Sequence, residues 1–196
     1  MEPEVRHTGG VVSRAPLAVR LARGDPSASR DLVERYHAGL YRYAVAILLD
    51  SSAAEDAVQD AFERALGALG RYSEERLEGM MLRPWLYRIT LNVVRNRLRR
   101  QREVLVGEDP STLLGIFTDG LGERREDVMD ALVALAYLPE KQRVAVTLRY
   151  LQDLPYAEIG RITGWPEGTA KTLVRRGLTR LRDLLILEDP KDGDAR

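Results

Sequence analysis

The sequence contains no cysteine, and this absence excludes disulfides, thiolate metal sites and cysteine nucleophiles together. Histidine is scarce as well, since only His7 and His37 are present. His7 lies in a polar N-terminal segment and His37 within a predicted helix, where a surface or packing role is expected, and neither has the spacing of a metal-ligand pair. We therefore expect no metal site, no cofactor and no catalysis by this chain alone.

Long hydrophobic runs are also missing. No apolar segment approaches the roughly 20 residues that cross a membrane, and the first residues lack the apolar core of a signal peptide. The chain is accordingly expected to be soluble and cytoplasmic. Predicted strands are almost absent, whereas 44% apolar residues suffice for a real core, so the expected fold class is all-α.

Lysine is the third residue in short supply. Of the 30 basic residues, Lys141, Lys171 and Lys191 are lysines and the other 27 are arginines. Arginine binds phosphate and guanine bidentately, although a biased genomic base composition would produce the same preference. Formal net charge is zero, so a nucleic-acid site would have to come from an uneven distribution of charge.

The stretch 154–185 predicts two helices joined by a tight turn. The first helix spans 155–162, the turn is 163–165, and Pro166 opens a second helix that runs to about Leu187. Gly164 supplies the positive φ that such a turn requires, and Gly160 allows close approach of the following segment. This is the helix-turn-helix pattern, whose second helix enters the DNA major groove.

The second helix has one apolar and one polar side. Its inward stripe comprises Ala170, Val174, Gly177, Leu181 and Leu184. Its opposite side, toward the N-terminal half, carries Lys171, Thr172, Arg175 and Arg176. Because base edges are read by that half of the helix, DNA binding is the favoured interpretation. A helical hairpin with a solvated basic face is the alternative.

Composition divides the chain into two small helical domains. The predicted parts are a flexible extension (1–15), a first domain (16–102), an acidic linker (103–124), a second domain with the helix-turn-helix (125–187) and a tail (188–196). From Glu103 to Glu123 the linker carries five acidic residues, no basic residue and several helix-breaking glycines.

An acidic helix is predicted after Ser52 in the first domain. Ser52 and Glu55 match a capping box, and Ser27 or Ser29 is expected to cap the preceding helix. The outer face of the acidic helix carries Glu55, Asp56, Gln59, Asp60 and Glu63. An acidic face cannot lie against phosphates, so it indicates either a basic protein partner or an ordinary solvated face. Spacing alone favours the solvated face.

The segment from Arg83 to Arg102 has the opposite charge, with seven arginines and no acid. Asn92, Asn96 and Arg99 share its basic side at i, i+4 and i+7. Seven uncompensated charges favour nucleic acid over a solvated face. Trp85 and Tyr87 stand among the basic residues, and aromatic rings beside arginines can stack with unpaired bases. Core packing is nevertheless the preferred interpretation of Trp85.

Four separated motifs follow one another along the chain: residues 54–62, residues 85–92, residues 138–150, and the helix-turn-helix with 156–159 and 167–172. The first two resemble the second region of bacterial sigma-70 factors, and the last two resemble the fourth region of that family. Two such regions on a short linker, without others, resemble the extracytoplasmic-function group. The resemblance covers about Pro16 to Leu187.

The resemblance implies a set of partners. The acidic helix would dock on the clamp coiled coil of the largest subunit of RNA polymerase, and the second domain would contact the flap of the second-largest subunit. The segment 83–102 would bind the minus-ten element as a single strand, and the helix-turn-helix would bind the minus-thirty-five element as duplex. The acidic linker would run through polymerase's nucleic-acid channels. An anti-sigma factor is a usual further partner.

The residues that the resemblance assigns fall in three sets. For polymerase docking they are Asp56, Gln59, Asp60 and Glu63; for the minus-ten element, Arg83, Tyr87, Arg88, Asn92, Arg95, Asn96 and Arg99; for the minus-thirty-five element, Glu167, Gly168, Thr169, Lys171, Thr172, Arg175 and Arg176.

Some positions depart from the family pattern. The loop 72–82 looks longer than usual, so the residues of the base pocket stay open. Leu173 and Leu178 are unusually apolar and are interpreted as extra core. Asp153 replaces a common glycine, and aspartate tolerates the left-handed conformation.

Two other functions were weighed. A stand-alone regulator that binds duplex operator as a dimer would explain the helix-turn-helix but would need neither the acidic helix nor the basic segment. A phosphate-binding loop is suggested by Gly164, Gly168, Lys171 and Thr172, but their spacing differs from the required motif and no strand precedes them.

Overall fold

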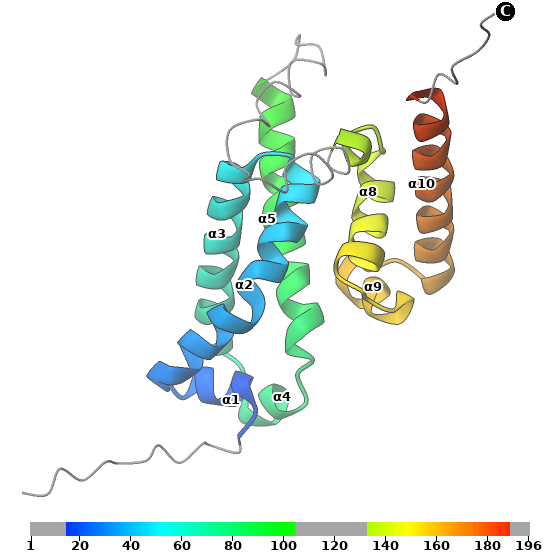
Figure 1. Ribbon diagram of the computed structural model, residues 1–196. Helices are drawn as coiled ribbons and strands as arrows, with labels where there is room; N and C mark the ends of the chain where they lie inside the picture. The colour runs from blue at the N-terminus through cyan, green and yellow to red at the C-terminus, as the bar shows by residue number, and fades with distance from the viewer. Residues whose placement is uncertain (1–14, 105–132, 189–196) are drawn as a thin grey trace, which may run out of the picture.

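The computed structural model describes residues 15–104 and 133–188, and within these ranges every regular element is helical (Figure 1). The N-terminal domain contains α1 (Leu17–Ala22), α2 (Pro26–Leu48), α3 (Ser51–Leu69), α4 (Glu74–Glu78) and α5 (Leu82–Val104). The C-terminal domain contains a helix ending at residue 136, then α8 (Glu140–Val146), the π-helical turn η2 (Thr147–Leu151), α9 (Tyr156–Thr163) and α10 (Glu167–Glu188). The all-α prediction is confirmed. The predicted flexible extension, nearly all of the acidic linker and the tail lie outside the described residues.

The N-termini of α2 and α3 are capped by aspartates, and the predicted serine caps are wrong. The Asp50 carboxylate accepts a hydrogen bond from the Ala53 amide at 2.8 Å, so Ser52 lies inside the first turn of α3. Asp25 caps α2 by accepting from the Ser27 amide at 2.9 Å. A carboxylate at this position satisfies the same unpaired amide that serine would, and adds a favourable charge at the helix dipole. The Ser27 and Arg20 hydrogen bonds lower the pKa of Asp25 to about 2.

The core of the N-terminal domain forms where α2, α3 and α5 pack together, with α1 and the short α4 closing one end (Figure 1). Tyr43 of α2 is fully buried, and its ring meets that of Tyr87 edge-on at 5.6 Å between centroids. Trp85 is half-buried and meets Tyr72 edge-on at 6.1 Å. The core interpretation of Trp85 is therefore confirmed.

The helix-turn-helix forms at α9 and α10 as predicted, with boundaries shifted by one residue. Gly164 has φ +78°, and a Cβ on Gly160 would lie 2.9 Å from the Trp165 carbonyl oxygen, so both glycines are required at the turn. The inward stripe of α10 is likewise confirmed: Ala170 and Val174 are buried, and a Cβ on Gly177 would collide with Val146 of α8.

The two domains pack against each other. Ala46 of α2 joins Leu138 and Val146 of the C-terminal domain in one apolar cluster, and α5 lies along α9. Arg143 adds a hydrogen bond from its guanidinium to the Ile47 carbonyl oxygen of α2 at 3.0 Å. Consequently α8 and α9 lie between the N-terminal bundle and α10, which forms the outer edge of the molecule (Figure 1).

Candidate nucleic-acid and polymerase interfaces

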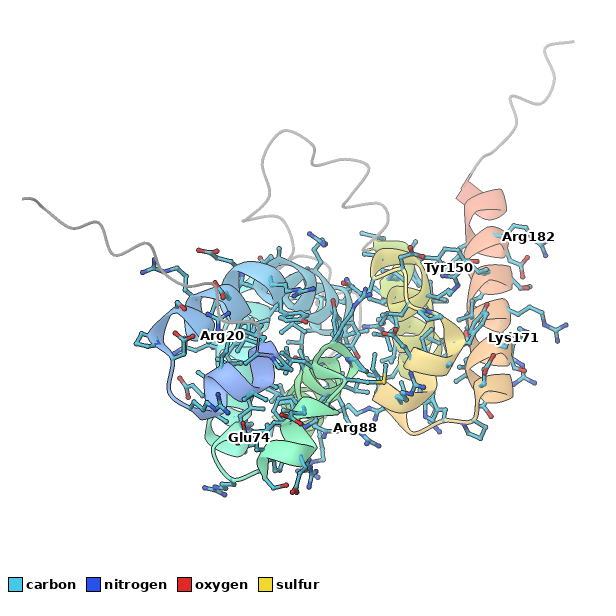
Figure 2. All side chains as sticks on the ribbon, turned by 90° about the horizontal axis from the view of Figure 1, so that it is seen from below. Arg20, Glu74, Arg88, Tyr150, Lys171 and Arg182 are labelled. Carbon is cyan, nitrogen blue, oxygen red and sulfur yellow. The ribbon has the colours of Figure 1, made fainter. Side chains whose placement is uncertain are left out.

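The outer side of α10 presents the residues that the sequence assigns to duplex DNA. Glu167, Gly168, Thr169, Lys171, Arg175 and Arg176 are exposed and Thr172 is half-buried. Figure 2 shows the Lys171 and Arg182 side chains on the side of α10 that faces away from the N-terminal bundle. The ammonium of Lys171 lies 5.7 Å from the Tyr156 ring centroid, a cation–π distance that links α10 to α9.

An arginine-rich hollow runs along the same helix. It is lined by Gln142, Arg175, Arg176, Thr179, Arg180 and Asp183. No carboxylate in the described part of the chain forms an ion pair with Arg175, Arg176 or Arg180. Their charges are therefore available to an external anion, and phosphate is the group that a guanidinium binds bidentately.

The predicted minus-ten residues fall on two edges of α5. Arg88, Asn92, Asn96 and Arg99 are exposed to solvent. The other edge, with Arg83, Tyr87 and Arg95, contacts the C-terminal domain.

Tyr87 is not accessible in this arrangement, because its side chain is only 3% exposed. Its hydroxyl donates a hydrogen bond to the side-chain oxygen of Gln152 at 2.6 Å, and Arg83 donates to the backbone oxygen of Gln152 at 2.6 Å. Burial raises the pKa of Tyr87, and the nearby charges of Arg83 and Arg42 offset part of that rise. Tyr87 is thus a neutral donor held by the other domain.

Arg95 and Arg97 of the basic segment have carboxylate partners in the described part of the chain, so the prediction of seven uncompensated charges is wrong. Arg95 lies 3.4 Å from Glu140 and 5.9 Å from the Trp165 ring centroid. Arg97 reaches α3, with contacts of 2.7 Å to Asp60 and 3.5 Å to Asp56. The sequence could not indicate these pairs, because each partner lies more than thirty residues away along the chain.

Helix α3, which carries the acidic face, lies on the opposite side of the molecule from α10 (Figure 1). Asp56, Gln59 and Glu63 are exposed and Asp60 is half-buried. Gln59 donates to the Glu63 carboxylate at 3.1 Å, which aligns these side chains one turn apart. Arg97 partly neutralises this face, but Glu63 has no basic partner among the described residues.

Several remaining predictions concern single residues. His37 stands on the surface of α2, where its ring Nε2 lies 3.0 Å from Glu55 and its plane parallels the Tyr41 ring. This contact fits the predicted surface or packing role. Leu178 is 38% exposed, so the interpretation of Leu178 as extra core is wrong, and Leu173 is half-buried. Asp153 has φ +47°, the left-handed conformation expected of a residue that stands in place of a glycine.

No group of residues in the described ranges has the composition and geometry of a metal site. Within those same ranges, no helix is long and apolar enough to cross a membrane.

Gln152 is the functional residue that the sequence does not reveal. It lies at the end of η2, where a backbone hydrogen bond from its amide to Thr147 closes a π-type turn, and the left-handed Asp153 follows. Only the left-handed residue leaves a sequence signal. The contact with α5 depends on tertiary packing, which no local pattern encodes.

Comparisons with known proteins agree with this architecture. Residues 32–104 match the family described as Sigma-70 region 2, and residues 129–181 match Sigma-70, region 4. ECF RNA polymerase sigma factor SigW of Bacillus subtilis is 31% identical over 183 residues, which cover 85% of this chain and 93% of that protein. ECF RNA polymerase sigma factor SigC of Mycobacterium tuberculosis is 31% identical over 90% of this chain and 91% of its own.

Solved structures share the fold. CnrH, in complex with the cytosolic domain of CnrY, has a TM-score of 0.68 at 21% identity and covers 88% of this chain and 97% of its own. The sigma factor RpoE from Bartonella quintana, in complex with the anti-sigma factor NepR, has a TM-score of 0.64 at 24% identity and covers 82% and 98%. With two family regions in the expected order and relatives matched along nearly their whole length, the chain belongs to the extracytoplasmic-function RNA polymerase sigma factors.

Proposed function

We propose that this sigma factor divides its work among three surfaces, each defined by its charge. The acidic face of α3 docks on the clamp of the largest polymerase subunit, α5 holds the minus-ten element as a single strand, and α10 binds the minus-thirty-five element as duplex. The observation that carries the proposal is the row formed by Arg175, Arg176 and Arg180 on α10, which are exposed and have no ion-pair partner among the described residues; α10 and α3 lie on opposite sides of the molecule (Figure 1).

The assignment of α10 follows from the geometry of the groove. A helix fits the major groove of duplex DNA, and residues in its N-terminal half reach base edges. Arg175 and Arg176 project from that half, next to Lys171 and Thr172, and the first turn brings its free amides toward a phosphate. The rest of the C-terminal domain lies behind the helix, where it leaves the outer side accessible and can contact the flap of the second-largest subunit.

The assignment of α5 follows from its side-chain types. Arg88, Asn92, Asn96 and Arg99 supply amide and guanidinium groups along one edge, suited to a phosphate backbone and to the polar edges of unpaired bases. Extracting a base from the stack costs a few kcal/mol, and contacts of this kind offset that cost.

Docking on polymerase is tested by charge reversal at Glu63. Because Glu63 is exposed and has no basic partner among the described residues, Glu63→Arg should leave the fold intact and weaken binding to core polymerase at least tenfold. Glu75→Arg on α4 is the matched control, since Glu75 is equally exposed but lies off the acidic face. Equal polymerase affinity in the two variants would show that the docking face is wrong.

Base reading by α10 is tested with Arg175→Ala. If the side chain contacts a base edge, the substitution should cost about 1–3 kcal/mol of promoter binding and relax the preference at one position of the minus-thirty-five element. The readout is run-off transcription with core polymerase on promoters that vary in that element. An unchanged preference at every position would exclude a base contact by Arg175.

Two partners follow from the same assignment, core RNA polymerase and an anti-sigma factor. Because a sigma factor acts with core polymerase, we propose the cytoplasm as the location of this chain. An anti-sigma factor is the expected inhibitor, because one of the structural neighbours described above is a sigma factor in complex with an anti-sigma factor.

A further inference from the structure

The interface between the two domains covers one edge of α5. Arg83, Tyr87 and Arg95, three of the seven residues assigned to the minus-ten element, contact η2, α8 and α9. A single strand cannot reach the buried Tyr87 hydroxyl while the domains stay packed. The reading face of α10, in contrast, is exposed except for the half-buried Thr172.

Gln152 makes the polar contacts at the centre of this interface. It is 6% exposed, its side-chain oxygen accepts from Tyr87 and its backbone oxygen accepts from Arg83, both at 2.6 Å. The π-type turn before it and the left-handed Asp153 after it fix its position. A π-type turn is uncommon within helices, and a positive φ is uncommon for residues other than glycine. Both conformations concentrate at functional sites.

The side chain of Gln152 is incompletely paired. Its nitrogen is buried without a hydrogen-bond partner among the described residues. Buried unpaired groups lower the net stability of an interface. The packed arrangement is therefore specific, through two short hydrogen bonds, and the unpaired group offsets part of its stability, which suits a contact that must open.

We propose that Gln152 is a latch that holds the free sigma factor closed, with one edge of the minus-ten segment of α5 (Arg83, Tyr87 and Arg95) held by the C-terminal domain and the minus-thirty-five face of α10 accessible. Opening frees Arg83, Tyr87 and Arg95 together, and single-stranded DNA competes with the C-terminal domain for the same side chains. The latch rests on the proposed assignment of α5 to the minus-ten element.

The test measures the separation of the domains and the affinity for single strands in the same full-length variants. Because the chain has no cysteine, Arg64→Cys on α3 and Arg182→Cys on α10 give two unique label positions, both exposed. Gln152→Met retains side-chain volume and removes the bond to Tyr87. Gln152→Ala is the second variant, and circular dichroism checks that both fold.

Loss of one buried hydrogen bond should raise the ratio of open to closed molecules about fivefold. Double electron–electron resonance should then show a larger population at long distance, and a fluorescent single-stranded DNA of mixed sequence should bind several-fold more tightly without polymerase. Arg149→Ala is the matched control, since Arg149 lies in the same turn and pairs with Asp153 rather than with α5. This control should change neither measurement.

The outcomes separate the two hypotheses. Unchanged distances in both Gln152 variants would overturn the latch, even if the wild-type chain directs initiation with core polymerase. Longer distances without any gain in single-strand affinity would overturn the coverage of a DNA-binding face, and with it the assignment of α5. A longer distance together with tighter single-strand binding supports both.

Discussion

Gly39→Ala should open the interface between the domains while it strengthens the helix in which it lies. Gly39 is in the middle of α2, and a Cβ at this position would lie 2.7 Å from the Tyr87 hydroxyl oxygen and 3.4 Å from the Gln152 side-chain oxygen. A separation of 2.7 Å is too short for a carbon against a hydroxyl. Tyr87 must therefore move, and its bond to Gln152 must lengthen or break.

This substitution has two energetic effects: one acts on the closed and the open molecule alike, and the other acts on the closed molecule alone. Alanine in place of glycine stabilises a helix interior by about 1 kcal/mol, in the closed and the open molecule alike. Breaking the bond between Tyr87 and Gln152 costs the closed form alone about 1 kcal/mol, or up to about 3 kcal/mol if either group stays buried without a partner. The ratio of open to closed molecules should thus rise roughly 5- to 150-fold.

The assay is the distance distribution between labels on α3 and α10, together with urea denaturation of the same protein. Gly67→Ala in α3 is the matched control, because a Cβ there meets no atom within 4 Å. The control should gain helix stability without any change in distance. If Gly39→Ala left the distance distribution identical to that of the control, the argument that a Cβ at position 39 displaces Tyr87 would be refuted.

Three further predictions concern stability. Gly164→Ala should lower the free energy of unfolding by about 1–2 kcal/mol in a urea titration, because φ +78° strains any residue with a Cβ; no loss would mean that the turn can relax. Tyr43→Phe should raise that free energy by about 1 kcal/mol, because the buried Tyr43 hydroxyl lacks a partner among the described residues; a loss would reveal a bond to the hydroxyl. Burial raises the pKa of both Tyr43 and Tyr87, so their contribution is intact below pH 10, where unfolded tyrosine titrates. Stability should fall above pH 10 by at most about 1.4 kcal/mol per pH unit for each tyrosine, and less steeply in Tyr43→Phe; a flat alkaline limb would contradict that burial.

Local signals in the sequence predicted much of the fold. The positive φ of Gly164 and of Asp153, the close approach at Gly160 and the inward stripe of α10 each depend on a few neighbouring residues, so a local pattern was enough to identify them. The helix caps failed for a local reason too. An aspartate stood just before each predicted serine, and a carboxylate is an equally good acceptor at the N-cap position.

The site was predictable in its charges and not in its pairings. The exposure of Arg175 and Arg176 followed from their place on an amphipathic helix. The partners of Arg83, Arg95 and Arg97 did not, since they depend on how α5 meets α3, α8 and η2 in three dimensions. A charge run in a sequence therefore overstates the charge that remains free after folding.

That distinction explains how a chain of zero net charge can serve two nucleic-acid surfaces differently. On α10, Arg175, Arg176 and Arg180 are exposed and form no ion pair with a carboxylate in the described ranges, so on the proposed assignment their field acts on DNA as soon as the chain meets it. On α5, two arginines form ion pairs within the protein: Arg95 with Glu140 of the C-terminal domain, and Arg97 with Asp60 and Asp56 of the docking face. On the proposed assignments, α10 binds duplex DNA without rearrangement, whereas full engagement of a single strand requires α5 to exchange protein partners for phosphates. Because these exchanges involve the C-terminal domain and the acidic face of α3, the affinity of α5 for a single strand must depend on what those two surfaces are bound to.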